Sequence, residues 1–136
     1  MKNKSLALDY IVRSTKRIKA VHLLFREASW ADVVRESQEV VELSLRGLLR
    51  HYNVEVPRVH DVSSILESEK DRFPAEVKSH LAKFTKISKT LRRDRELAFY
   101  GSEDLTPSEF YKKDDAESAM EQAEWIVKIL AKIIIP

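Results

Sequence analysis

Apolar residues recur every three or four positions along most of the chain, which is the spacing of one face of an α-helix. No segment shows the sustained alternation of apolar and polar residues, bounded by turn residues, that is typical of a strand. Only two glycines and four prolines interrupt the 136 residues, so the segments between breaks are long. The pattern therefore predicts an all-α protein.

The first half of the chain predicts two long helices. The first is expected over residues 5–28, and the second runs from an N-cap at Ser29, with Asp32 as the acidic member of a capping box, to about Tyr52. Gly47 inside the second helix costs about 1 kcal/mol relative to alanine, which indicates a close helix contact. The short connection makes the pair antiparallel. The expected inner face of the first helix comprises Leu8, Ile11, Val12, Thr15, Ile18, His22 and Phe25.

The second half predicts a short helix, from His60 or Asp61 to Ser68, and then two long ones. Pro74 is well placed to open the fourth helix and Gly101 to end it. A short turn over residues 107–111 precedes a last helix over residues 114–134. The expected inner face of that helix comprises Ala116, Ala119, Met120, Ala123, Ile126, Val127, Leu130 and Ile134. The prediction is an up-and-down bundle of four long helices plus a short helix, in one domain spanning residues 1–136.

The charge is balanced overall but uneven along the chain. There are 24 basic and 22 acidic residues, so the formal charge of +2 gives no general attraction to nucleic acid, and any anion site must be local. Residues 86–95 carry five cations against Asp94 alone, and residues 2–19 are also basic, whereas residues 103–117 are mostly acidic. Such segments would suit self-association as well as nucleic-acid binding.

Several classes of function are disfavoured by composition. Without cysteine there is no disulfide, thiolate chemistry or cysteine zinc site, and the isolated glycines make no phosphate loop. The histidines lack metal-ligand spacing, so we expect no metal and no cofactor. Neither a signal peptide nor a membrane span is predicted, and we expect a cytoplasmic protein without a membrane partner. The charged fraction of 34%, with two Asn and two Gln, is typical of heat-adapted proteomes.

The best candidate for function is an arginine cluster near the end of the fourth helix. Arg92, Arg93 and Arg95 fall within one turn, and Arg95 occupies a position on the apolar stripe that continues from Leu91. Crowded guanidiniums repel each other unless an anion or a partner compensates them, and phosphate matches their planar fork. A solvated basic helix end is the alternative explanation.

Three parts of the sequence resemble the HEPN family of small helical nucleotide-binding domains. They are residues 30–52, the stretch from Val56 to Val62 with its His60-Asp61 pair, and residues 93–101. Many members of the family have an Arg followed after four to six residues by His, and one toxin group adds a Tyr two residues beyond. Arg93 and Tyr100 fall in register with that pattern, but Ala98 occupies the histidine position.

The resemblance implies a nucleotide- or RNA-associated protein, working as a homodimer beside a minimal nucleotidyltransferase in a toxin–antitoxin type of module. Arg92, Arg93, Arg95 and His60 would then bind phosphate or RNA, and Tyr100 would be the acceptor of a transferred nucleotide. One alternative is a metal-independent endoribonuclease using Arg93 and Tyr100 in a site shared across the dimer, although losing the histidine costs a factor of about 10² to 10⁴. Another is a helical dimer without a nucleic-acid role. For Tyr100 itself, the alternative is a tyrosine that caps the core beside the last helix.

Overall fold

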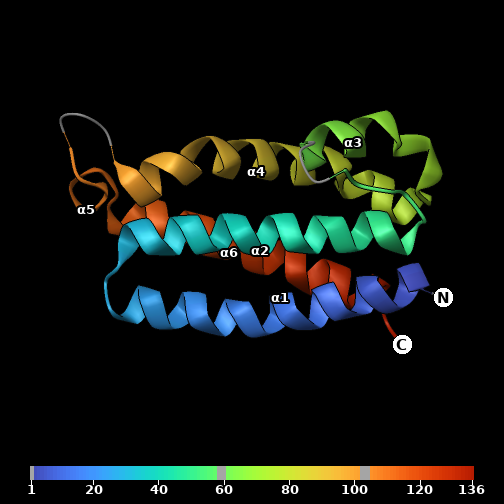
Figure 1. Ribbon diagram of the computed structural model, residues 1–136, viewed down its shortest axis with the longest axis horizontal. Coiled ribbons are helices and arrows are strands. Elements are labelled where there is room, and N and C mark those ends of the chain that lie inside the picture. The colour runs from blue at the N-terminus through green and yellow to red at the C-terminus, as the bar shows by residue number, and fades with distance from the viewer. Residues whose placement is uncertain (1, 58–60, 102–104) are drawn as a thin grey trace.

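The computed structural model describes residues 2–57, 61–101 and 105–136, and the side chains of these residues apart from Lys2 and residues 93–99. The described residues form helices and no strand, so the all-α prediction is confirmed. The long helices are α1 (Lys2–Arg26), α2 (Trp30–His51), α4 (Ala75–Tyr100) and α6 (Lys113–Ile133). The short ones are α3 (Val62–Ser68), the 3₁₀ turn η1 (Lys70–Arg72) and α5 (Pro107–Phe110) (Figure 1).

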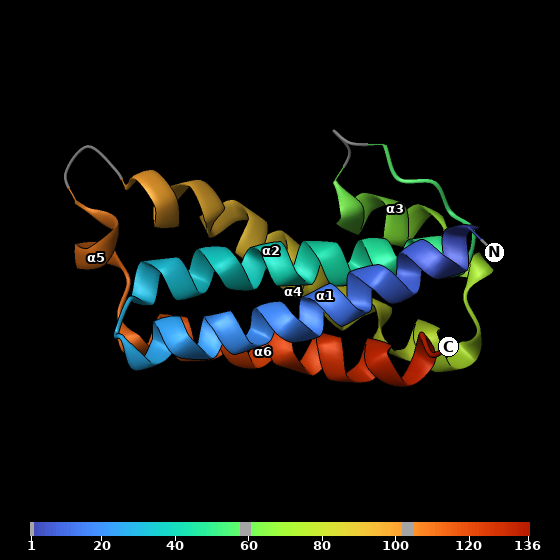
Figure 2. The same ribbon diagram turned by 60° about the horizontal axis from the view of Figure 1, so that its bottom comes forward.

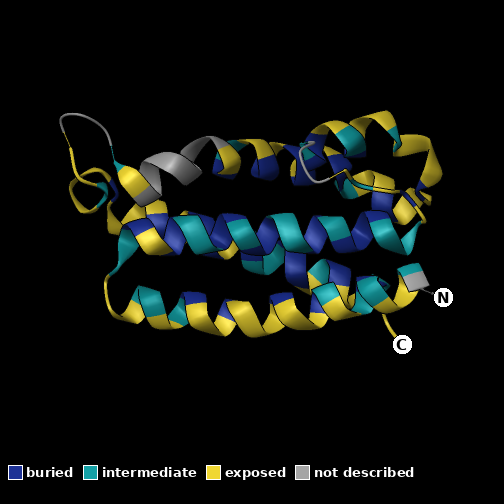
Figure 3. Ribbon diagram, in the orientation of Figure 1, coloured by how far each residue is buried: buried dark blue, intermediate teal, exposed yellow. Residues whose placement is uncertain are grey.

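The helix α2 lies at the centre of the bundle, in contact with α1, α4 and α6, while α3 packs on α4 (Figures 1 and 2). The four long helices run alternately up and down, and both chain ends lie at the same end of the bundle. Because three helices surround α2, buried residues occur on most of its sides, as Figure 3 shows. The outer side of α1 is exposed, so α2 rather than α1 organises the core.

The predicted helix boundaries agree with the structure to within about three residues, since apolar periodicity and the Pro and Gly breaks define them. All eight residues of the predicted inner face of the last helix are buried. The predicted face of the first helix is partly wrong, because Val12 and Thr15 are exposed. The buried stripe instead consists of Ala7, Ile11, Ser14, Ile18 and Val21. Small side chains at Ala7 and Ser14 allow α1 to lie close to its neighbours, which rotates the buried stripe.

The starts of α5 and α2 differ in how they are capped. Thr106 and Glu109 form the capping box of α5, in which the Thr106 hydroxyl accepts from the Glu109 amide at 3.2 Å. Ser29 occupies the N-cap position of α2 but makes no side-chain capping bond. Its hydroxyl donates instead to the Asp32 carboxylate at 2.6 Å, so the predicted capping box at Ser29 is absent.

Both glycines are explained by their surroundings. A Cβ at Gly47 would lie 3.4 Å from the carbonyl oxygen of Ala7 and from Cβ of Tyr10, which confirms the close contact with α1. Gly101 follows the last residue of α4 with φ of +84°, a left-handed conformation that ends the helix as predicted. Within the described residues, no helix has the length and apolar character needed to cross a membrane.

Candidate anion-binding site

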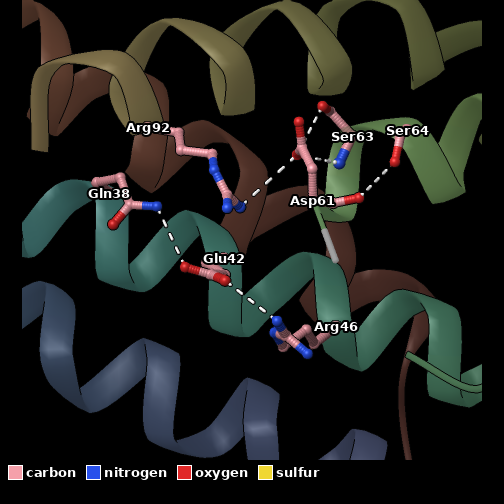
Figure 4. A network of polar contacts seen from close by, with 7 residues as sticks. All are labelled: Gln38, Glu42, Arg46, Asp61, Ser63, Ser64 and Arg92. Atoms are coloured by element: carbon pink, nitrogen blue, oxygen red, sulfur yellow. Dashed lines mark hydrogen bonds and ion pairs between the residues drawn. The ribbon is translucent and has the colours of Figure 1, made fainter. Parts of the chain in front are cut away.

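The site is organised by Asp61, the N-cap residue of α3. Its carboxylate oxygen Oδ1 accepts hydrogen bonds from the Ser63 amide at 2.9 Å and from the Ser63 hydroxyl at 2.8 Å. The Ser64 hydroxyl donates to the Asp61 carbonyl at 2.8 Å (Figure 4). These bonds satisfy donors at the helix start and hold the carboxylate where α3 approaches α4.

Arg92 reaches from α4 to this carboxylate. One guanidinium nitrogen lies 3.8 Å from Asp61 Oδ1, which is an ion pair but too long for a hydrogen bond. The Arg92 side chain is 45% exposed. A guanidinium has five N–H donors, so this single long contact leaves donors directed at solvent that a phosphate or carboxylate could engage.

The environment of Asp61 favours the charged carboxylate. Partial burial raises the pKa of Asp61, but the hydrogen bonds from the Ser63 hydroxyl and amide and the positive charges of Arg92 and Lys89 together outweigh it. The net pKa of Asp61 is therefore below its ordinary value. Asp61 is thus an anion at neutral pH, and its charge attracts the guanidinium of Arg92.

Polar side chains of α2 form the other side of the site (Figure 4). Gln38 donates from Nε2 to Glu42 at 3.2 Å, and Arg46 donates to the other carboxylate oxygen of Glu42 at 3.2 Å. Gln38 is only 3% exposed, and its oxygen Oε1 has no hydrogen-bond partner among the described residues. Sequence reasoning did not assign these three residues to the site, although their spacing of four residues, interrupting an apolar helix, could have indicated it.

Of the predicted site residues, the structure brings Arg92 to Asp61 and places Tyr100 two turns further along α4. The side chains of Arg93, Arg95 and Ala98 lie outside the described residues, as does all of His60. Tyr100 is 76% exposed and is the last residue of α4. Such exposure argues against the alternative that this tyrosine caps the core.

His51 does not take the place of the motif histidine that Ala98 replaces. His51 ends α2, about 14 Å along the helix axis from Glu42 at 1.5 Å per residue. Burial and then the nearby Lys4 lower the pKa of His51, and its ring packs edge-on against Tyr52. Among the described residues, no group of three or more His, Asp or Glu side chains is arranged to hold a metal ion.

Comparison with known families gives one match. The model of the HEPN domain family matches residues 7–134, which is nearly the whole chain. Searches of curated proteins and of solved structures found no match. The family match agrees with the all-α bundle and includes α2, the Asp61 segment and the end of α4. The chain therefore belongs to the HEPN domain family, a class of nucleotide- or RNA-associated helical proteins.

Proposed function

We propose that this HEPN protein is the nucleotide-accepting component of a two-protein module, in which a minimal nucleotidyltransferase modifies Tyr100 and so controls the binding of RNA or nucleotide to the arginines of α4. The protein would act as a homodimer. The observation that carries this proposal is the exposure of Tyr100. It is 76% exposed at the end of α4, whereas Tyr10, Tyr52 and Tyr111 are partly or fully buried.

The end of α4 is a suitable place for an enzyme to reach a tyrosine. The helix stops at Tyr100 because Gly101 adopts a left-handed conformation, so the backbone turns away directly after the phenol. A Cβ at Gly101 would lie 2.8 Å from the carbonyl oxygen of Leu105, which means that the chain folds back tightly there. The side chain is therefore presented at a corner of the bundle.

The proposed modification is a nucleotidyl transfer. The phenol oxygen of Tyr100 attacks the α-phosphorus of ATP and forms a new O–P bond. The bond from the α-phosphorus to the oxygen shared with the β-phosphate breaks, pyrophosphate leaves, and the phenolic proton passes to a base of the transferase or to solvent. The product is a phosphodiester with one negative charge, which adds an anion to a helix that carries Arg92, Arg93 and Arg95.

The same arginines would serve both states of the module. In the unmodified protein, the exposed guanidinium of Arg92 has donors free to engage an RNA phosphate. Arg93 and Tyr100 are seven residues apart in a continuous helix, and positions with that spacing share a face. A nucleotide on Tyr100 would therefore compete with RNA for the arginines of that face.

The proposal is tested by incubating the protein with a minimal nucleotidyltransferase and ATP and measuring the intact mass. The wild-type protein should gain whole nucleotide units, and the Tyr100→Phe variant should gain none, because it lacks the acceptor oxygen. Tyr10→Phe is the matched control, since Tyr10 is partly exposed on α1, and it should be modified like the wild type. An adduct of equal mass on the Tyr100→Phe variant would refute the assignment.

A further inference from the structure

Two segments of the chain carry cations and no carboxylate, although 22 carboxylates are distributed over its 136 residues. Residues 125–136, at the C-terminal end, contain Lys128 and Lys132. Residues 10–26, which form most of α1, contain five cations: Arg13, Lys16, Arg17, Lys19 and Arg26. Neither segment takes part in the site described above.

The fold places these segments side by side. The helices α1 and α6 pack together and run in opposite directions (Figures 1 and 2). His22 Nε2 lies 2.9 Å from Glu124 Oε2, which fixes how one helix is aligned with the other. One turn away from this pair, toward the end of the bundle where the two chain termini lie, are Lys19 on α1 and Lys128 on α6. One turn further along, α1 carries Lys16 and α6 carries Lys132. The axes of two packed helices lie about 8–10 Å apart.

Together these residues form a basic face, which we define as Lys16, Lys19, Lys128 and Lys132. All four are exposed, and none has an ion pair within the part of the chain that the structure describes. The neighbouring arginines differ, since Arg13 lies 3.7 Å from Asp9 and Arg17 lies 3.9 Å from Glu36.

The carboxylate nearest to Lys128 by helical spacing is Glu124, which is already paired with His22. The basic face is therefore a cluster of like charges that an anionic partner would stabilise.

We propose that the basic face binds the phosphate backbone of single-stranded RNA, which deepens the proposed function and rests on it. Lysine ammonium groups on flexible stems act as point charges, so they suit contacts to phosphate that read no sequence. A membrane surface fits less well, because a basic surface without an apolar helix face gains only about 1 kcal/mol per lysine from anionic lipids. The apolar side of α1, with Ile11, Ile18 and Val21, is buried within the bundle.

The basic face is distinct from the site of Arg92. The helix α2 lies between α1 and α4 in the bundle (Figure 1). An RNA strand held on α1 and α6 would thus use a second surface, independent of whether Tyr100 carries a nucleotide. The basic face would supply general affinity, and the arginines of α4 would supply the contact that modification controls.

The test is fluorescence anisotropy of a labelled single-stranded RNA oligonucleotide of about 16 nucleotides over a series of salt concentrations. The variant Lys16→Gln/Lys19→Gln/Lys128→Gln/Lys132→Gln should bind roughly tenfold more weakly or worse near 0.1 M salt, with the slope of log K against log salt smaller by about 0.7 per lost contact. The control has the same change in charge on exposed lysines elsewhere, namely Lys70→Gln/Lys78→Gln/Lys112→Gln/Lys113→Gln. It should retain the wild-type slope.

The double variants Lys16→Gln/Lys19→Gln on α1 and Lys128→Gln/Lys132→Gln on α6 should each produce about half of the change in slope. They keep the test valid if the fourfold variant fails to fold. Equal losses of RNA affinity in the fourfold lysine variant and in its control would overturn the proposal that the basic face binds RNA. An absence of RNA binding by the wild type would also overturn it. The proposal would likewise fail if the fourfold variant still bound RNA but no longer bound phosphatidylserine vesicles. Nucleotide addition at Tyr100 is scored separately by mass, so failure of the proposed function is distinguishable from failure of this inference.

Discussion

At the scale of single residues, Asp61 links the start of α3 to the arginine of α4. Replacing Asp61 with alanine removes the capping oxygen for Ser63 and the partner of Arg92, and should lower the free energy of unfolding by about 1 kcal/mol. Urea denaturation measures this change. Asp61→Asn should lose less, because asparagine also caps helices and the partly exposed ion pair contributes little. Asp71→Ala, at a side chain that is 90% exposed, is the control and should change little.

The lowered pKa of Asp61 predicts that the stability of the protein depends on pH. Because the folded protein holds the pKa of Asp61 below its ordinary value, the charged carboxylate stabilises the fold above the unfolded pKa of about 3.9. That stabilisation disappears as the pH falls through the folded pKa. The difference in stability between wild type and Asp61→Ala should therefore be constant near neutrality and shrink below about pH 4. A difference that grows on acidification would contradict the assignment.

The residues of the site could be predicted only in part. The arginine cluster is visible in the sequence because charge interrupts an apolar stripe at Arg95. The partner of Arg92 is Asp61, which is distant in sequence and becomes a neighbour only when α3 packs on α4. Gln38 and Glu42 were missed because a polar side chain on a helix normally faces solvent. Here α2 is enclosed on three sides, so even its polar residues are largely covered.

At the scale of elements, the contact between α1 and α2 depends on Gly47. Replacing Gly47 with leucine should destabilise the protein by about 1–3 kcal/mol, because the larger side chain meets the backbone of Ala7 and the side chain of Tyr10. Thermal and urea unfolding should both record the loss. Ala20→Leu, on the exposed side of α1, adds three of the same four carbon atoms in open space and should change stability by less than about 0.5 kcal/mol. Equal effects of both substitutions would show that the contact is unimportant.

The inner face of α6 was easier to predict than the inner face of α1. The inner face of α6 follows regular spacing, so its seven buried residues, and Ile134 directly after the helix, could be identified from the pattern alone. For α1 the pattern favoured the larger residues Val12 and Thr15, but Ala7 and Ser14 are buried because small side chains permit close packing. The cap at Ser29 failed for a local reason, since its backbone, with φ of −89° and ψ of 70°, is not in the extended conformation of an N-cap residue.

At the scale of the whole molecule, we predict a symmetric homodimer. Leu105 and Phe110 are large apolar side chains, each at least 39% exposed, and they lie just before and at the end of α5. Exposed apolar groups in one region are typical of an interaction surface, and identical chains associate most often through a twofold axis. Light scattering at micromolar concentration should give about twice the chain mass of 15.8 kDa. A mass of one chain throughout would count against the dimer.

The central claim is that Tyr100 is the acceptor of a nucleotide, and tandem mass spectrometry tests it most directly. Trypsin should release residues 96–112 as one peptide, which contains both Tyr100 and the buried Tyr111. After incubation with the transferase and ATP, fragment ions should place the added nucleotide on Tyr100. A nucleotide located on Tyr111 or on a serine or threonine of this peptide, or a peptide that stays unmodified, would contradict the proposed function.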